Sequence, residues 1–187
     1  MRHLYLLLLL FSPRPFVGQT IAWQSIQVHP VGLNAARLSS AEKAAIRALL
    51  KPELEEIADL CVAGQPGLDD LTFDEAPLGT HSIVYVAPGW GCTGGGNSSG
   101  NWLVEIRAGH PLLLGTTLGW GLRVQPHASM GLHDFVNYWS GGGGEIGISY
   151  YRFDGTTYRS IGSHSIIPCD EGYCYKEGGR PLDWKLP

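Results

Sequence analysis

The sequence predicts an α+β protein in which a short helical segment precedes a mainly antiparallel β meander. Apolar residues at helical spacing are confined to residues 23–62. Residues 80–187 instead alternate short runs of β-branched and aromatic residues with glycine loops. Two stretches of this β-rich part follow the same plan, which indicates an internal duplication. We therefore expect a sandwich or a propeller-like fragment.

The first residues predict an export signal. Two basic residues precede the apolar run Leu4–Phe11, which is too short to span a bilayer. Small residues before Trp23 occupy the positions that define cleavage, so residues 1–22 are interpreted as a signal peptide. Cleavage after Gly18 is the competing site, and a buried hydrophobic first strand is the alternative interpretation.

The remaining residues 23–187 have the length of a single globular domain. The formal net charge is −4, and the basic residues are scattered, so there is no electrostatic footprint for nucleic acid. No basic amphipathic helix favours a membrane surface. We expect a secreted or periplasmic protein with no nucleic-acid partner and no membrane association after signal cleavage.

The helical part begins with a capping signal. Ser39 and Glu42 have the spacing of a capping box, in which each side chain accepts a hydrogen bond from an early backbone amide. An apolar stripe at helical spacing follows. Pro52 then suits the first turn of a second helix, Glu53–Leu60.

An acidic segment, Gly64–Gly79, separates the helices from the strands. It reads as a loop or linker. The Asp-x-Asp-x-Asp-Gly spacing of a calcium loop is absent, so we assign no metal site there.

The first copy of the predicted meander begins with the strand Ser82–Val86. The glycine-rich loop Pro88–Gly100 leads to Asn101–Arg107, in which apolar and polar residues alternate with the period of a strand. Ala108–His110 is the turn, and Leu112–Leu114 is the return strand.

The second copy begins with the strand His133–Trp139, followed by the glycine run Gly141–Gly144. Glycine loses the most backbone entropy on ordering, so this run predicts a loop. Glu145–Phe153 is the next strand, and Tyr158 and Ile161 lie on the return strand.

Two local features refine this second copy. The apolar alternation shifts at Tyr150–Tyr151, which predicts a bulge that swaps faces. Asp154–Gly155 is a strong hairpin signal for a type I′ turn, whose two central residues have positive φ. Gly109 and Leu112 match Gly155 and Tyr158 at one offset, which supports the duplication.

Four cysteines fall in the exported part: Cys61, Cys92, Cys169 and Cys174. An even number in an oxidising compartment predicts two disulfides, with three pairings open to sequence alone. We favour Cys169–Cys174 as a clip across a final hairpin, which leaves Cys61–Cys92 to tie the helical part to the first glycine loop. A zinc site is the second interpretation, but no Cys-x2-Cys spacing supports it.

No pattern of catalytic residues stands out. His133 and Asp134 are adjacent, but neighbours in a strand point to opposite faces, so the two are poorly placed to act as one dyad. No serine sits in a Gly-x-Ser-x-Gly elbow. The glycine run Gly94–Gly100 lacks the Lys-Ser/Thr of a phosphate loop. We therefore assign no catalytic residue, metal or cofactor.

Several motifs resemble exported bacterial proteins with a helical N-terminus and hairpin repeats similar to FG-GAP/VCBS units. They are Leu38–Glu42, Leu49–Pro52, Gly91–Gly95, Tyr151–Gly155 and Tyr158. The resemblance spans Leu38–Ile161 and implies a periplasmic or surface role without catalysis. This chain lacks the acidic calcium loop of the better-known repeats, so the resemblance does not extend to metal binding.

The sequence favours a non-enzymatic binding domain whose ligand is a protein or a glycan. Aromatic residues beside glycine loops suit a contact surface. The candidates are Trp90, Trp102, Trp120, Tyr138 and Trp139. About half of such aromatics are expected to fill the core instead. The alternative is a small secreted hydrolase using His133 or His127 with a nearby carboxylate.

Overall fold

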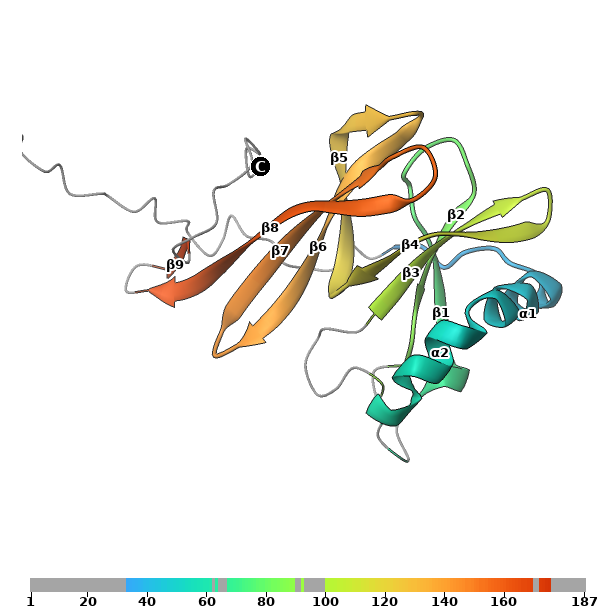
Figure 1. Ribbon diagram of the computed structural model, residues 1–187, viewed down its shortest axis with the longest axis horizontal. Coiled ribbons are helices and arrows are strands. Elements are labelled where there is room, and N and C mark those ends of the chain that lie inside the picture. Colours follow the sequence, from blue (N-terminus) through green and yellow to red (C-terminus); the bar gives the residue numbers. More distant parts are fainter. Residues whose placement is uncertain are drawn as a thin grey trace, which may run out of the picture.

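The computed structural model describes residues 33–61, 63, 67–89, 92, 100–169 and 172–175. For Leu60, Leu68, Trp120 and the residues from Pro168 onward, only the backbone of these ranges is described. The predicted signal peptide lies outside the described residues. Within them the chain forms short helices followed by two antiparallel sheets, which confirms the predicted α+β class (Figure 1).

The helical part begins as the capping signal predicted. Helix α1, Ser40–Leu49, follows Ser39, whose hydroxyl accepts the Glu42 N–H at 3.2 Å. The Glu42 carboxylate in turn accepts the Ser39 N–H at 2.8 Å. Helix α2 spans Lys51–Ile57 with a proline in its first turn, and the 3₁₀ turn Ala58–Leu60 continues it.

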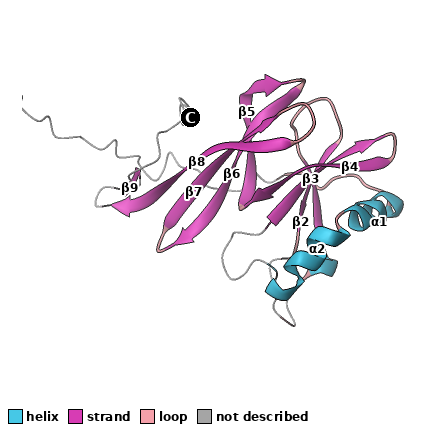
Figure 2. Ribbon diagram, in the orientation of Figure 1, coloured by secondary structure: helices cyan, strands magenta, loops and turns pink. Residues whose placement is uncertain are grey.

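Both α-helices cover one face of the first sheet (Figure 2). Ile46 lies on α1, and Leu50 follows the last residue of the helix, four positions later. Both side chains are fully buried against that face. Trp102 is buried in the same cluster. The apolar stripe of the sequence therefore forms a helix-on-sheet core.

The first sheet has the order β1-β2-β3-β4. The prediction of a loop over Gly64–Gly79 is wrong at β1, where Phe73 pairs with Val86 of β2. Asp74 and Glu75 are poor strand formers, but pairing on both sides of β1 satisfies their backbone: the Glu75 N–H donates to the Asn34 carbonyl. The strands are β1 Thr72–Glu75, β2 Ile83–Ala87, β3 Gly100–Arg107 and β4 His110–Leu118.

The second sheet has the order β5-β6-β7-β8-β9. Its first strand was not expected from the sequence. Gly119 alone separates β4 from β5, with a φ of 107°, and a Cβ there would collide with the Tyr138 carbonyl. The chain therefore changes sheets at this glycine. The strands are β5 Trp120–Ser129, β6 Leu132–Gly142, β7 Glu145–Phe153, β8 Tyr158–Cys169 and β9 Gly172–Tyr175.

The turn at Asp154–Gly155 is not of type I′, which corrects the prediction. Gly155 has a φ of 102°, but Asp154 is not among the positive-φ residues. The connection is instead four residues long, because the Asp154 carboxylate accepts the N–H groups of Thr156 and Thr157, each at 2.9 Å. Both central residues have positive φ in the Ala108–Gly109 turn, at 51° and 80°.

The register does shift between Tyr150 and Tyr151, which confirms the predicted bulge. The two tyrosines keep to opposite faces of β7, however, so the faces are not swapped. The extra residue lies in β8, where Gly162 pairs with Tyr150 and Ser160 with Tyr151. The alternation looked broken in the sequence because β7 is buried on both faces.

A shared core joins the sheets, as in a sandwich. Tyr85 and Leu103 of the first sheet pack with Phe135 and Tyr151 of the second. We call the face of the second sheet that takes part in this core its inner face. A separate apolar cluster lies on the opposite face, in β6, β7 and β8.

Both sheets consist of consecutive antiparallel strands, an arrangement that an internal duplication would produce. The two matched positions differ in burial, however: Leu112 is 43% exposed and Tyr158 only 4%. The duplication therefore stays a prediction.

Candidate binding surface on the inner face of the second sheet

The structure separates the five aromatic residues proposed as a contact surface. Trp102 and Tyr138 are buried in clusters on different sheets, so they are core residues and do not form a surface. Trp90 lies outside the described residues, and only the backbone of Trp120 is described. Trp139 is partly exposed. Of the described aromatic side chains in this set, Trp139 is the one that can contact a ligand.

Trp139 lies at the end of β6, three residues before the Gly142–Glu145 pair that closes the β6–β7 hairpin. It pairs with Gly147 of β7, and a Cβ added to Gly147 would fall on the indole atoms Cε2, Cζ2 and Cδ2. The indole therefore lies across the glycine. The missing side chain at Gly147 is what lets a large ring rest on the sheet.

Small polar residues surround Trp139 on the inner face. The cross-strand register sets Trp139, Gly147 and Ser165 in one row, and Asn137, Ser149 and Ser163 in the next. Residues paired directly across antiparallel strands share a face. We call this set of six residues the Trp139 surface. Ser163 is exposed and Ser165 partly exposed, so the surface opens toward β8.

Asn137 forms the buried floor of this surface. Its Nδ2 lies 3.3 Å from Tyr85 Oη and 3.4 Å from Thr117 Oγ1, both across the space between the sheets. Its Oδ1 has no hydrogen-bond partner among the described residues. Rotating the amide would exchange the two atoms, because hydroxyls both donate and accept, and would leave the nitrogen without a partner instead.

The hydroxyls around Asn137 are buried and neutral. Burial raises the pKa of Tyr85 to about 12. Burial likewise raises the pKa of Tyr151, whose hydroxyl accepts the Leu118 N–H at 3.3 Å. The polar groups between the sheets are therefore hydrogen-bonding groups and carry no charge at neutral pH.

Gly119 brings the start of β3 close to Trp139. The Asn101 Nδ2 donates to the Gly119 carbonyl, and a Cβ on Gly119 would lie 3.0 Å from Trp139 Cβ. Most of the glycine-rich loop that precedes β3, Pro88–Gly100, lies outside the described residues.

A second set of polar residues surrounds Asp134 of β6. The fully buried Asp134 Oδ2 accepts hydrogen bonds from His127 Nδ1 and Arg152 Nε, both at 2.9 Å. Asp134 Oδ1 has no partner among the described residues. His133 instead donates from Nδ1 to the Gln125 carbonyl at 3.0 Å. The adjacent residues His133 and Asp134 therefore do not bond to each other, and His127 is the histidine that bonds to the Asp134 carboxylate.

A similar cluster in the first sheet was missed by sequence reasoning. Glu105 of β3 is buried, with His81 Nδ1 at 2.5 Å and Arg107 Nη2 at 2.7 Å. Burial alone would raise the pKa of the Glu105 carboxyl, but the hydrogen bonds from His81 and Arg107 outweigh it and hold that pKa below its ordinary value. The alternating pattern put Glu105 in the polar phase of its strand, together with Arg107, so nothing in the sequence indicated that Glu105 is buried.

The two clusters supply only part of a catalytic apparatus. An imidazole oriented by a buried carboxylate is the base of a nucleophilic triad. In the described part of the chain, neither His127 nor His81 is bonded to a serine, threonine or cysteine side chain. Nor do three or more metal-ligating His, Cys, Asp or Glu side chains come together among the residues the structure describes.

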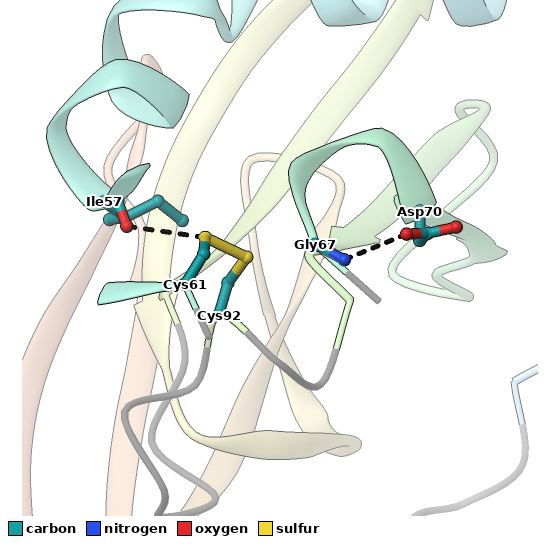
Figure 3. Close-up of a disulfide and its surroundings, with 5 residues drawn as sticks. All are labelled: Ile57, Cys61, Gly67, Asp70 and Cys92. Atoms are coloured by element: carbon teal, nitrogen blue, oxygen red, sulfur yellow. Dashed lines mark hydrogen bonds between the residues drawn. A yellow bond between two sulfur atoms is a disulfide. The ribbon is translucent and has the colours of Figure 1, made fainter. Parts of the chain in front are cut away.

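A disulfide joins Cys61, after the helical part, to Cys92, in the connection between β2 and β3 (Figure 3). This is the longer of the two favoured bridges. Cys61 Sγ also lies 3.7 Å from the Ile57 carbonyl oxygen, but a disulfide sulfur has no hydrogen to donate. The side chains of Cys169 and Cys174 lie outside the described residues, although β8 and β9 form the predicted final hairpin.

Comparison with known proteins gives no match to a family model, to a curated protein or to a solved structure. Among the described residues, no helix has the length and apolar character needed to cross a bilayer.

Proposed function

We propose that this protein is a non-enzymatic binding domain of a secreted or periplasmic compartment, and that it contacts its ligand through the Trp139 surface. The observation that carries the proposal is the position of the Trp139 indole. It lies on Gly147, is partly exposed, and has small polar residues beside it on the same face. The resemblance to exported hairpin-repeat proteins remains a prediction that agrees with this role.

A tryptophan held in this way is well suited to binding. Its rigid ring offers a large contact area and loses little conformational entropy, so such residues often dominate binding energy. The backbone of two paired strands fixes its position. An aromatic residue on a rigid support can contribute about 1–2 kcal/mol to a complex without any chemical step.

The compartment is argued from the amino-terminal run Leu4–Phe11 and from the Cys61–Cys92 disulfide. Disulfides persist in oxidising compartments and are rare in the cytosol. N-terminal sequencing of the protein expressed in a bacterial host should begin at Trp23 or Gln19. A mature protein that still begins at Met1 would contradict export.

The binding role is tested by screening the mature protein on glycan and peptide arrays, alone and as Trp139→Ala. We expect at least one reproducible interaction that the variant loses. Met130→Ala is the matched control, because Met130 is an exposed apolar residue at the opposite end of β6. Circular dichroism establishes that both variants fold. If folded Trp139→Ala retains every interaction, the Trp139 surface is not the binding site.

A hydrolase remains the second candidate because His127 is oriented by the buried Asp134 carboxylate. Its imidazole is 56% exposed and accessible to a substrate. The test compares His127→Ala with His133→Ala on chromogenic esters and peptides. Hydrolysis by wild type that only His127→Ala abolishes would favour the enzyme over the binding domain.

A further inference from the structure

The Trp139 surface carries hydrogen-bonding groups and no charged residue, and these two properties indicate the chemistry of its ligand. Resting on the proposed function, we infer that this surface binds a neutral carbohydrate, with one pyranose ring stacked on Trp139. The inference depends on three features of the inner face: a flat aromatic ring, unengaged hydroxyls and a buried amide atom without a partner.

The aromatic ring provides the apolar part of the site. Binding sites for small molecules combine aromatic walls with a few placed polar groups. The C–H faces of a pyranose are apolar, whereas its rim carries hydroxyls, so a sugar can stack on an indole and hydrogen-bond around it. Because one face of the Trp139 ring rests on Gly147, the opposite face is the one left for a ligand.

Serine side chains supply hydroxyl partners beside the ring. Ser165 is in the row of Trp139, and Ser163 is in the row of Asn137. No hydrogen bond to either hydroxyl is present among the described residues, and both are at least partly exposed. A serine hydroxyl both donates and accepts, as a sugar hydroxyl does, so the two chemistries are complementary.

Asn137 indicates independently that a hydrogen-bonding partner is missing from this surface. It is fully buried, it points between the sheets, and one atom of its amide is unsatisfied in either orientation. Such an atom is expensive to bury. Asn137 and Trp139 are two residues apart on one face, which separates them by about 7 Å. For a sugar ring stacked on Trp139 to satisfy this atom, one of its hydroxyls or a bridging water must enter the space between the sheets.

The charges of the described residues favour a neutral ligand over an anionic one. The Trp139 surface contains no charged residue, and Glu145 is the next residue of β7 on the same face beyond Gly147. None of the six residues of the Trp139 surface is a cation that could pair with a carboxylate or phosphate of a ligand. The inference is therefore for neutral sugars and against uronic acids or phosphorylated glycans.

The test measures binding of the full mature protein by titration calorimetry. The probes are the neutral hexasaccharides of β-1,4-glucan, β-1,3-glucan and β-1,4-mannan, with a hexagalacturonate as the anionic counterpart. We expect at least one neutral probe to bind and the galacturonate not to bind. Trp139→Ala should weaken that binding about tenfold or more, whereas Trp139→Tyr, which keeps a flat ring, should weaken it less. Ser163→Ala with Ser165→Ala should also weaken it, and Met130→Ala should not.

The outcomes separate this inference from the proposed function. If no neutral probe binds but a peptide on the array binds through Trp139, the carbohydrate inference is wrong and the binding role stands. Stronger binding of galacturonate than of every neutral probe would also overturn it. If neutral sugars bind equally to wild type and to folded Trp139→Ala, both the inference and the placement of the site are wrong.

Discussion

The indole of Trp139 lies across Gly147 of the neighbouring strand, in the space where any larger residue would place its side chain. The two residues are eight apart in sequence and directly paired in the sheet. The glycine thus has a structural purpose that its sequence context did not reveal: it is the support on which the ring rests. The size of the residue at position 147 therefore determines whether the Trp139 indole can lie on the sheet.

Gly147→Ala should displace the indole and destabilise the protein. The added Cβ would overlap Trp139, and overpacking of this kind commonly costs about 1–3 kcal/mol. Urea unfolding gives the free energy, and near-UV circular dichroism reports the tryptophan environment. Gly100→Ala is the matched control, since a Cβ there meets nothing within 4 Å. An unchanged near-UV spectrum for Gly147→Ala would contradict the contact.

Arg152→Met should destabilise the protein more than Asp134→Asn does. Losing the arginine leaves the buried Asp134 carboxylate with only His127 as a hydrogen-bond partner, and an uncompensated buried charge costs about 2 kcal/mol or more. Asp134→Asn removes the charge itself, and the exposed Arg152 is then solvated.

A double-mutant cycle measures this coupling by urea unfolding. The destabilisation of Arg152→Met with Asp134→Asn should be smaller than the sum of the two single effects. Strictly additive values would show that the pair contributes nothing to stability.

The Glu105 cluster should make stability depend on acid pH. The pKa of the Glu105 carboxyl is lower in the folded protein than its ordinary value of 4.5 in the unfolded chain. Its contribution is therefore fully present above about pH 4.5 and is lost as the pH falls through the folded pKa. Glu105→Gln should flatten that part of the profile of melting temperature against pH. The exposed Glu56 provides the control Glu56→Gln, and equal slopes for both variants would contradict the cluster's role.

Removal of the Cys61–Cys92 disulfide should lower the free energy of unfolding. The bridge closes a loop with a sequence separation of 31, for which the chain-entropy argument gives about 3–4 kcal/mol. Urea unfolding compares two double variants. One carries Cys61→Ser and Cys92→Ser, and the other carries Cys169→Ser and Cys174→Ser, which would remove a bridge that closes a much shorter loop. A larger loss from the second pair than from the first would oppose this assignment.

Local features were predictable from the sequence because they depend on neighbouring residues. The Ser39–Glu42 capping box, the strand Glu145–Phe153 and the register shift at Tyr150–Tyr151 all lie where the sequence indicated. Each depends on backbone sterics or on side-chain alternation within a few residues. Strand β1 was missed for the same reason, since its acidic residues are unfavourable locally and only pairing on both edges stabilises them.

The sequence by itself determined the class of the protein: helices first, then short antiparallel strands with glycine turns. The tertiary structure alone decided which sheet each strand joins, because that choice depends on the change of direction at Gly119. It also decided that Trp102 and Tyr138 are buried while Trp139 is partly exposed, although all three are aromatic residues of predicted strands. Burial and pairing join residues far apart in the chain, as His81 and Glu105 show, and no local pattern encodes which distant residue will arrive.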